Sequence, residues 1–115
     1  MNEENNALLE AISKRFKLLS DSNRLLVLSY LKNEEMNVTQ IIDATGLKQA
    51  NVSKILNFLA QEKVVGRRKE GNSVYYHIED ESIFELCSIV CENLQKSTAN
   101  FAKLVSSENP FLNAS

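Results

Sequence analysis

The sequence predicts a mainly helical, single-domain protein with one short β-hairpin. Its 115 residues fit a single domain at the usual ratio of roughly one domain per 150 residues. Hydrophobic residues make up 43% and charged residues 24% of the chain, which is typical of a globular protein. Three glycines and one proline leave few turn positions, and apolar residues recur at helical spacing. Together these observations disfavour an all-β or α/β fold.

The first three helices are predicted from apolar spacing and from residues that cap helices. Apolar residues recur every three or four positions over residues 4–19, which predicts an amphipathic helix. Residues 20–22 form a break with capping side chains, and residues 23–32 predict a second helix that is apolar on nearly every side and therefore central to the core. Thr39 is expected to cap a short third helix over residues 40–45, which Gly46 ends.

A fourth helix and a β-hairpin follow. Residues 49–61 predict a helix with one apolar stripe, formed by Val52, Ile55, Leu56 and Leu59. Helix, short glycine-containing turn and helix are the outline of a helix-turn-helix. Residues 64–69 and 73–78 are rich in β-branched and aromatic residues, so they predict two strands of a hairpin with Gly71 at positive φ in its tip.

A last long helix is predicted to begin after Asp80, its expected N-cap, and to reach about Val105. Its apolar seam consists of Ile83, Cys87, Val90, Leu94 and Phe101. The first and last helices thus both carry apolar faces that one small domain does not need for its own core.

The net charge of −2 hides an asymmetry along the chain. Residues 48–77 hold six lysines and arginines against two glutamates, a net charge of +4, and the remaining residues carry −6. A basic central segment between acidic ends is typical of a domain that presents one face to phosphates. An ordinary solvated surface would have the same composition, so charge alone leaves both interpretations open.

A helix-turn-helix followed by a basic hairpin predicts a winged-helix domain that places the second helix of the pair in the major groove of DNA. Short polar or basic side chains suited to base edges lie opposite that helix's apolar stripe or just before it: Lys48, Gln49, Ala50, Ser53, Lys54 and Asn57. In the hairpin, four residues are predicted to contact phosphates and to add affinity more than sequence preference: Arg67, Arg68, Lys69 and Asn72. The alternatives are a solvated helix face and a charged hairpin without a ligand.

The run from Phe16 to Leu94 resembles the ArsR/SmtB family of bacterial winged-helix repressors. FKLLSDSNRLLVLSYL is similar to the family's opening signature, GLKQANVSKILNFLAQEKVV to its helix-turn-helix, and RRKEGNSVYYHI to its wing. The resemblance implies a homodimer, formed through the first and last helices, that binds double-stranded operator DNA and is released by an inducer, usually a metal ion or an oxidant. Residues 1–105 would then be one winged-helix DNA-binding and dimerisation domain, and residues 106–115 a flexible C-terminal tail.

The sequence departs from the resemblance at the metal sites. The family's thiolate site uses a Cys-x-Cys pair where this chain has Asn37 and Thr39. The family's second site uses Asp, His, His and Glu, and the aligned residues here are Asp80, Ser82, Asn93 and Lys96. Only the aspartate remains, and it is expected to act as an N-cap. His77, the only histidine, is expected to be a structural or surface residue.

Cys87 and Cys91 are the remaining candidates for sensing. Their i, i+4 spacing puts both thiols on one helix face with Cβ atoms about 5–6 Å apart. A disulfide needs about 3.5–4.5 Å, so closing one within an intact helix would distort it. Across a two-fold interface up to four thiols meet, enough for an interchain disulfide, a polysulfide link or a thiophilic metal such as Zn, Cu(I) or As(III). Alternatively, both cysteines are small hydrophobic core residues. No other cofactor is predicted.

The sequence therefore predicts a homodimeric, sequence-specific transcriptional repressor released by an inducer at Cys87 and Cys91. A winged helix for protein docking and a repressor with purely structural cysteines are the alternatives. An enzyme is not expected, because the chain has one histidine, no Gly-rich phosphate loop and no Cys-x-x-Cys redox motif. It also has no apolar run near the roughly 18–20 residues of a membrane span, no secretory signal pattern and only two cysteines, so a cytoplasmic protein is expected.

Overall fold

The computed structural model describes residues 2–97 and 109–111. Their elements, in chain order, are α1 (Glu3–Leu18), α2 (Ser22–Leu31), β1 (Met36–Asn37), α3 (Val38–Thr45), α4 (Gln49–Gln61), β2 (Val65–Glu70), β3 (Ser73–Ile78) and α5 (Ser82–Ser97). The predicted winged helix-turn-helix, with four helices, a hairpin and a last helix, is confirmed. The prediction that the last helix reaches about Val105 concerns residues outside the described part beyond Ser97.

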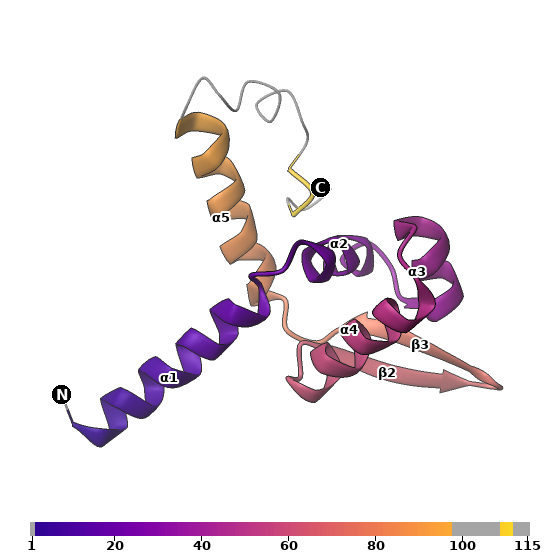
Figure 1. Cartoon of the computed structure of the whole chain (residues 1–115), viewed down its shortest axis with the longest axis horizontal. Coiled ribbons are helices and arrows are strands. Elements are labelled where there is room, and N and C mark those ends of the chain that lie inside the picture. Colours follow the sequence, from indigo (N-terminus) through magenta and orange to yellow (C-terminus); the bar gives the residue numbers. More distant parts are fainter. Residues whose placement is uncertain (1, 98–108, 112–115) are drawn as a thin grey trace.

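Figure 1 shows α2, α3, α4 and the β2–β3 hairpin gathered into one body, from which α1 and α5 project in different directions. The end of α1 and the start of α5 meet, and there Arg15 Nη1 lies 3.0 Å from Asp80 Oδ2. Because the two helices leave the body near one point, most of their length lies away from it. No helix within the described residues has the length and apolar character to cross a membrane.

The sheet has three antiparallel strands in the order β1-β3-β2. In the hairpin, pairing runs from Val65 opposite Ile78 to Glu70 opposite Ser73. β1 adds Met36 opposite Tyr76 on the other edge of β3. This strand was not predicted, because two residues are too short to show a strand period. It ties the loop after α2 to the wing.

The core lies where α2, α3 and α4 pack against the sheet. The predicted central position of α2 is confirmed, because Val27 and Leu28 are fully buried. The other buried apolar residues are Leu18, Leu31, Ile41, Val52, Ile55, Leu56, Leu59, Val64, Val65, Tyr76, Ile83 and Phe84. No polar or charged residue is buried within the described part of the chain. The hydrophobic effect therefore dominates the stability of this body.

At the start of α2 and at the end of α3 the helix ends follow the predicted chemistry, and at the start of α3 they do not. Asp21 caps α2 through a 3.0 Å hydrogen bond from Arg24 N. The prediction that Thr39 caps α3 is wrong: Asn37 is the cap, and it forms a capping box in which its side chain and that of Gln40 each accept the other's backbone N–H. Gly46 ends α3 with φ of 74°, a left-handed conformation that glycine adopts at little cost.

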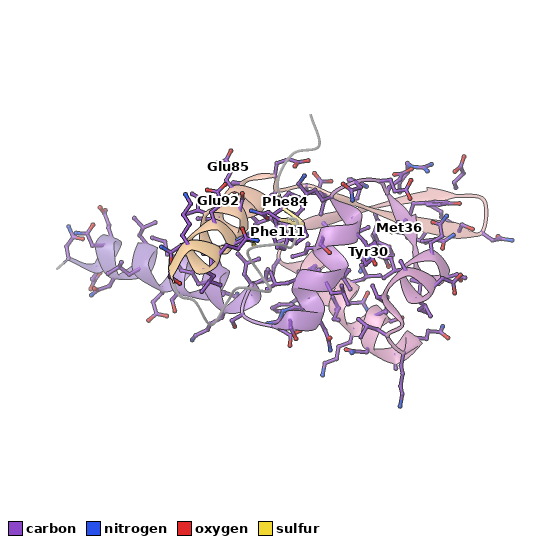
Figure 2. All side chains as sticks on the ribbon, turned by 90° about the horizontal axis from the view of Figure 1, so that it is seen from above. Tyr30, Met36, Phe84, Glu85, Glu92 and Phe111 are labelled. Atoms are coloured by element: carbon purple, nitrogen blue, oxygen red, sulfur yellow. The ribbon has the colours of Figure 1, made fainter. Side chains whose placement is uncertain are left out.

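The C-terminal residues 109–111 pack against α5. Asn109 Nδ2 donates to the backbone oxygen and to Oγ of Ser88, at 3.3 and 3.2 Å. The rings of Phe111 and Phe84 stack with centroids 6.1 Å apart, and Figure 2 shows them side by side at the base of α5. The other residues of the segment predicted as a flexible tail, 106–108 and 112–115, lie outside the described residues.

Candidate nucleic-acid interface

The turn between α3 and α4 is held by side-chain hydrogen bonds. Thr45 Oγ1 donates to Ile41 O at 2.7 Å and accepts from Leu47 N at 3.2 Å. With Gly46 in the left-handed region, this arrangement redirects the chain within three residues. α4 then begins at Gln49 with Lys48 as its N-cap residue.

α4 has one buried and one exposed face. Its apolar stripe from Val52 to Leu59 is buried, as predicted. The predicted DNA-contacting residues lie on the opposite side: Gln49, Ala50, Lys54 and Asn57 are exposed and Ser53 is half-buried. Lys48 makes no side-chain cap, unlike the N-caps of α1, α2 and α3. The first N–H groups of α4 therefore have no capping side chain, and a helix N-terminus of this kind attracts anions.

The wing is joined directly to α4 by Arg67. Its Nη2 donates to Asn57 Oδ1 at 2.8 Å. Its guanidinium lies over the Tyr76 ring, 5.7 Å from the ring centroid, which is within the limit of about 6 Å for a cation–π contact. Lys69 and Asn72, nearer the hairpin tip, are exposed. Gly71 at the tip has φ of 61°, which confirms the predicted positive φ. α4 and the wing thus form one continuous polar surface.

Arg68 points to the other face of the hairpin and is engaged by two carboxylates. Its Nε donates to both oxygens of Glu35, at 3.0 and 3.2 Å, and Nη2 donates to the same carboxylate. Nη1 donates to Glu70 Oε2 at 3.2 Å, and the guanidinium lies 5.0 Å above the centroid of the Tyr75 ring. The hydrogen bond from Arg68 holds the pKa of Glu35 below its usual value, and the hydrogen bonds to Glu35 and Glu70 raise the pKa of Arg68.

Large apolar side chains on α1 and α5 face solvent in the isolated chain. Their exposed fractions reach 60% for Leu8 and 64% for Ile89. The others on these two helices are Leu9, Ile12, Phe16, Leu86, Val90 and Leu94. Exposed apolar side chains gathered on two neighbouring elements mark an interaction surface.

Cys87 and Cys91 line a groove that includes part of this apolar surface. Both thiols are free and half-buried. The groove, of about 560 Å³, is lined almost entirely by apolar residues from α1, α2, α5 and the C-terminal segment, including Phe16, Leu25 and Phe111. Burial raises the pKa of the Cys87 thiol, so this group is protonated at neutral pH.

The acidic and imidazole groups near α5 have local partners. Asp80, the predicted N-cap, lies two residues before Ser82, the first residue of α5. Its Oδ1 accepts from Ser82 N at 3.0 Å, and its Oδ2 pairs with Arg15. His77 Nε2 lies 2.9 Å from Glu79 Oε1, in space that a side chain at Gly66 would fill. In the described residues, no group of three or more His, Cys, Asp or Glu side chains is arranged to hold a metal ion.

Comparison with known proteins places this architecture in a family. A model described as bacterial regulatory protein, arsR family, matches residues 21–65. The HTH-type transcriptional regulator MJ1325 of Methanocaldococcus jannaschii is 36% identical over 84 residues, which cover 72% of this chain and 94% of that protein. The transcriptional repressor SmtB homolog of Synechocystis sp. is 30% identical over 88 residues, covering 76% and 67%. The chain belongs to the ArsR family.

This ArsR-family protein is therefore a DNA-binding transcription regulator, and the proteins it matches are regulators rather than enzymes. A solved structure, the homodimeric winged helix-turn-helix DNA-binding domain Mb0332 of Mycobacterium bovis, superposes with a TM-score of 0.74 at 28% identity. The match covers 87% of this chain and 93% of that domain. It confirms the winged helix-turn-helix architecture of the ArsR-family chain.

Three contacts of the site were not predicted. Glu35 reaches Arg68 across 33 positions of the sequence, Arg67 reaches Asn57, and Arg15 reaches Asp80. The sequence gives no signal for such contacts, because the two residues of each pair lie ten or more positions apart and meet only when the chain folds. The position of Asn57 relative to the apolar stripe correctly predicted that it lies on the exposed face of α4. It gave no indication that a wing residue would contact Asn57.

Proposed function

We propose that this ArsR-family regulator is a homodimeric, sequence-specific repressor that inserts α4 of each subunit into the major groove of an operator. The observation that carries the proposal is the division of α4 into a buried apolar stripe and an exposed polar face. The wing lies beside the same helix, because Arg67 contacts Asn57. Both elements are therefore available to one DNA duplex, as in other winged-helix proteins.

The side chains divide by chemistry into two groups. Gln49, Ala50, Ser53, Lys54 and Asn57 would face base edges, where amides pair with adenine and Ala50 can contact a thymine methyl. Phosphates would be contacted by Lys48, next to the uncapped start of α4, and by Arg67, Arg68, Lys69 and Asn72 of the wing. The first group would supply sequence preference and the second would supply affinity that decreases with salt.

The apolar faces of α1 and α5 support the homodimer. A two-fold pairing of the chain through these helices would bury side chains such as Leu8 and Ile89, which are otherwise in water. Two α4 helices related by such an axis would reach half-sites whose centres lie about one helical turn, or roughly 34 Å, apart. The operator would then be an imperfect palindrome.

The inducer would act at Cys87 and Cys91, which lie on the groove between α1, α2 and α5. An oxidant that joins two of these thiols removes two electrons and two protons from them and forms one disulfide across the interface. Either this link or a thiophilic metal would change how the two α5 helices pair and hence the spacing of the two α4 helices. The apolar lining and the raised pKa of Cys87 are the observations behind a second candidate, a repressor in which both cysteines only pack.

Selection of DNA by the purified protein tests the proposal. Fragments of its own promoter region, bound at moderate salt and sequenced, should yield an imperfect palindrome. Affinity for that sequence should fall steeply as salt increases. If no fragment is retained in gel shifts at low salt, α4 does not read DNA, and the winged helix would serve protein docking instead.

A further inference from the structure

The contacts of Arg68 differ from those of the other wing cations. Each of its three guanidinium nitrogens donates to a carboxylate, two of them to Glu35 and one to Glu70. Arg67 donates to the neutral amide of Asn57, no ion pair within the described residues includes it, and Lys69 is exposed. The cluster of Arg68 with Glu35 and Glu70 carries a net negative charge, although the sequence RRK alone suggests three available cations.

The position of Glu35 is set by the sheet. Met36, the next residue, pairs with Tyr76 of β3, so the loop after α2 is fixed to the edge of the sheet away from β2. From there Glu35 reaches across Tyr75 of β3 to Arg68 of β2, whose guanidinium rests on that aromatic ring. Both charged groups remain partly in water, with side-chain exposures of 37% and 44%. A phosphate therefore has access to the guanidinium, but only in competition with the carboxylate.

We propose that Glu35 is an affinity-determining residue that competes with DNA phosphate for Arg68, so that the free protein holds this wing cation in a neutralised state. The inference rests on the proposed DNA-binding function. An operator phosphate must break the contacts between Arg68 and Glu35 before the wing gains its full electrostatic contribution. The acidic residue thereby lowers affinity for every sequence alike, because it acts on backbone contacts and not on base readout.

The substitution Glu35→Gln tests the competition, and Glu34→Gln is its matched control. Both remove one carboxylate from the same exposed loop, and among the described residues no ion pair joins Glu34 to Arg68. Affinity for operator and for unrelated DNA is measured by fluorescence anisotropy over a salt series. We expect Glu35→Gln to bind both DNAs about threefold or more tightly than Glu34→Gln, with a log–log salt slope steeper by about one phosphate contact.

A second background separates competition from a general charge effect. In Arg68→Gln protein, Glu35→Gln should have no more effect than Glu34→Gln, because the cation that Glu35 neutralises is gone. Equal effects of the two glutamate substitutions in the wild-type background, or weaker binding by Glu35→Gln, would overturn the inference. These results differ from a failure of the proposed function, in which the wild-type protein itself would bind no DNA and the inference would fall with it.

Discussion

Asn57 of α4 accepts a hydrogen bond from Arg67 of β2, with Oδ1 and Nη2 2.8 Å apart. This contact joins the helix that is proposed to lie in the major groove to the wing that is proposed to lie on the backbone. Tyr76, beneath the guanidinium, belongs to the buried core, so the arginine is supported from below while its far side faces solvent. The helix and the wing are therefore already joined by this contact in the DNA-free protein.

The first prediction concerns this contact. We expect Asn57→Ala and Arg67→Ala each to weaken operator binding by roughly fivefold, equivalent to about 1 kcal/mol, because each removes the same hydrogen bond. Asn57→Ala should in addition relax base preference, because its amide is proposed to face base edges. The DNA affinity of the double variant should be only slightly below that of whichever single variant binds less tightly, since the two residues act as a unit. Anisotropy titrations of the three variants measure this. Fully additive losses in the double variant would show that Asn57 and Arg67 do not act as a unit.

The second prediction separates readout from affinity. Gln49→Ala and Lys54→Ala should relax base preference at one operator position each, by about 1–3 kcal/mol for a lost bidentate contact. Lys69→Gln should weaken all sequences alike and lower the salt slope by about one. Binding to a library of operator variants measures both effects, with Lys96→Ala as the control that removes an exposed cation on α5. Identical specificity profiles for Gln49→Ala and Lys69→Gln would contradict this division.

The helices and the hairpin could be predicted because each depends on local patterns. The apolar spacing of α4 gave its bounds and its exposed face, and turn chemistry gave the end of α3 at Gly46 and the positive φ of Gly71. The N-cap of α3 was misplaced because Asn37 and Thr39 are both capping residues, and only the backbone path shows which one starts the helix. Glu35 and Arg68 could not be paired from the sequence, because β1, which brings them together, has only two residues.

The third prediction tests the dimer. Ile89→Glu places a charge at the most exposed large apolar residue of α5, which should be buried in the dimer. We expect a shift from dimer to monomer in light scattering and at least a tenfold loss of operator affinity, because the two half-sites are then bound separately. Tyr30→Glu is the control, because Tyr30 is also partly exposed but lies on α2 (Figure 2). A dimer that tolerates Ile89→Glu, or that is lost only in Tyr30→Glu, would place the interface elsewhere.

The fourth prediction concerns the thiols. If Cys87 and Cys91 sense an oxidant, diamide should release operator DNA from the wild-type protein, and Cys87→Ser/Cys91→Ser should not respond. Diamide accepts the two electrons and two protons that two thiols lose on forming a disulfide. Release by diamide that is unchanged in the double variant would show that both cysteines are structural.

The reaction should also depend on pH in a defined direction. Burial raises the pKa of Cys87 above its usual value, and the thiolate is the reactive form, so the thiolate fraction at neutral pH is small. Alkylation of Cys87 by iodoacetamide, followed by mass spectrometry, should therefore accelerate steadily as the pH rises from 7 and should level off at a higher pH than alkylation of an ordinary cysteine. An unfolded peptide that contains Cys87 is the control, and its alkylation rate should level off at a lower pH than that of the folded protein. A plateau for Cys87 below pH 8 would mean that its pKa is lowered instead.

The fifth prediction concerns the end of α4. Lys63 adopts φ of 63°, a left-handed conformation that costs a residue with a Cβ atom about 1 kcal/mol or more. Its backbone N–H donates to Ala60 O at 3.1 Å, and its side chain is exposed, so no side-chain packing is lost on replacement. We expect Lys63→Gly to raise the free energy of unfolding by about 0.5–1 kcal/mol, because relief of strain outweighs the extra chain entropy of glycine. Lys63→Ala keeps the Cβ atom and should change stability little. Urea unfolding measures both variants, and a destabilised Lys63→Gly would show that the left-handed turn is not strained.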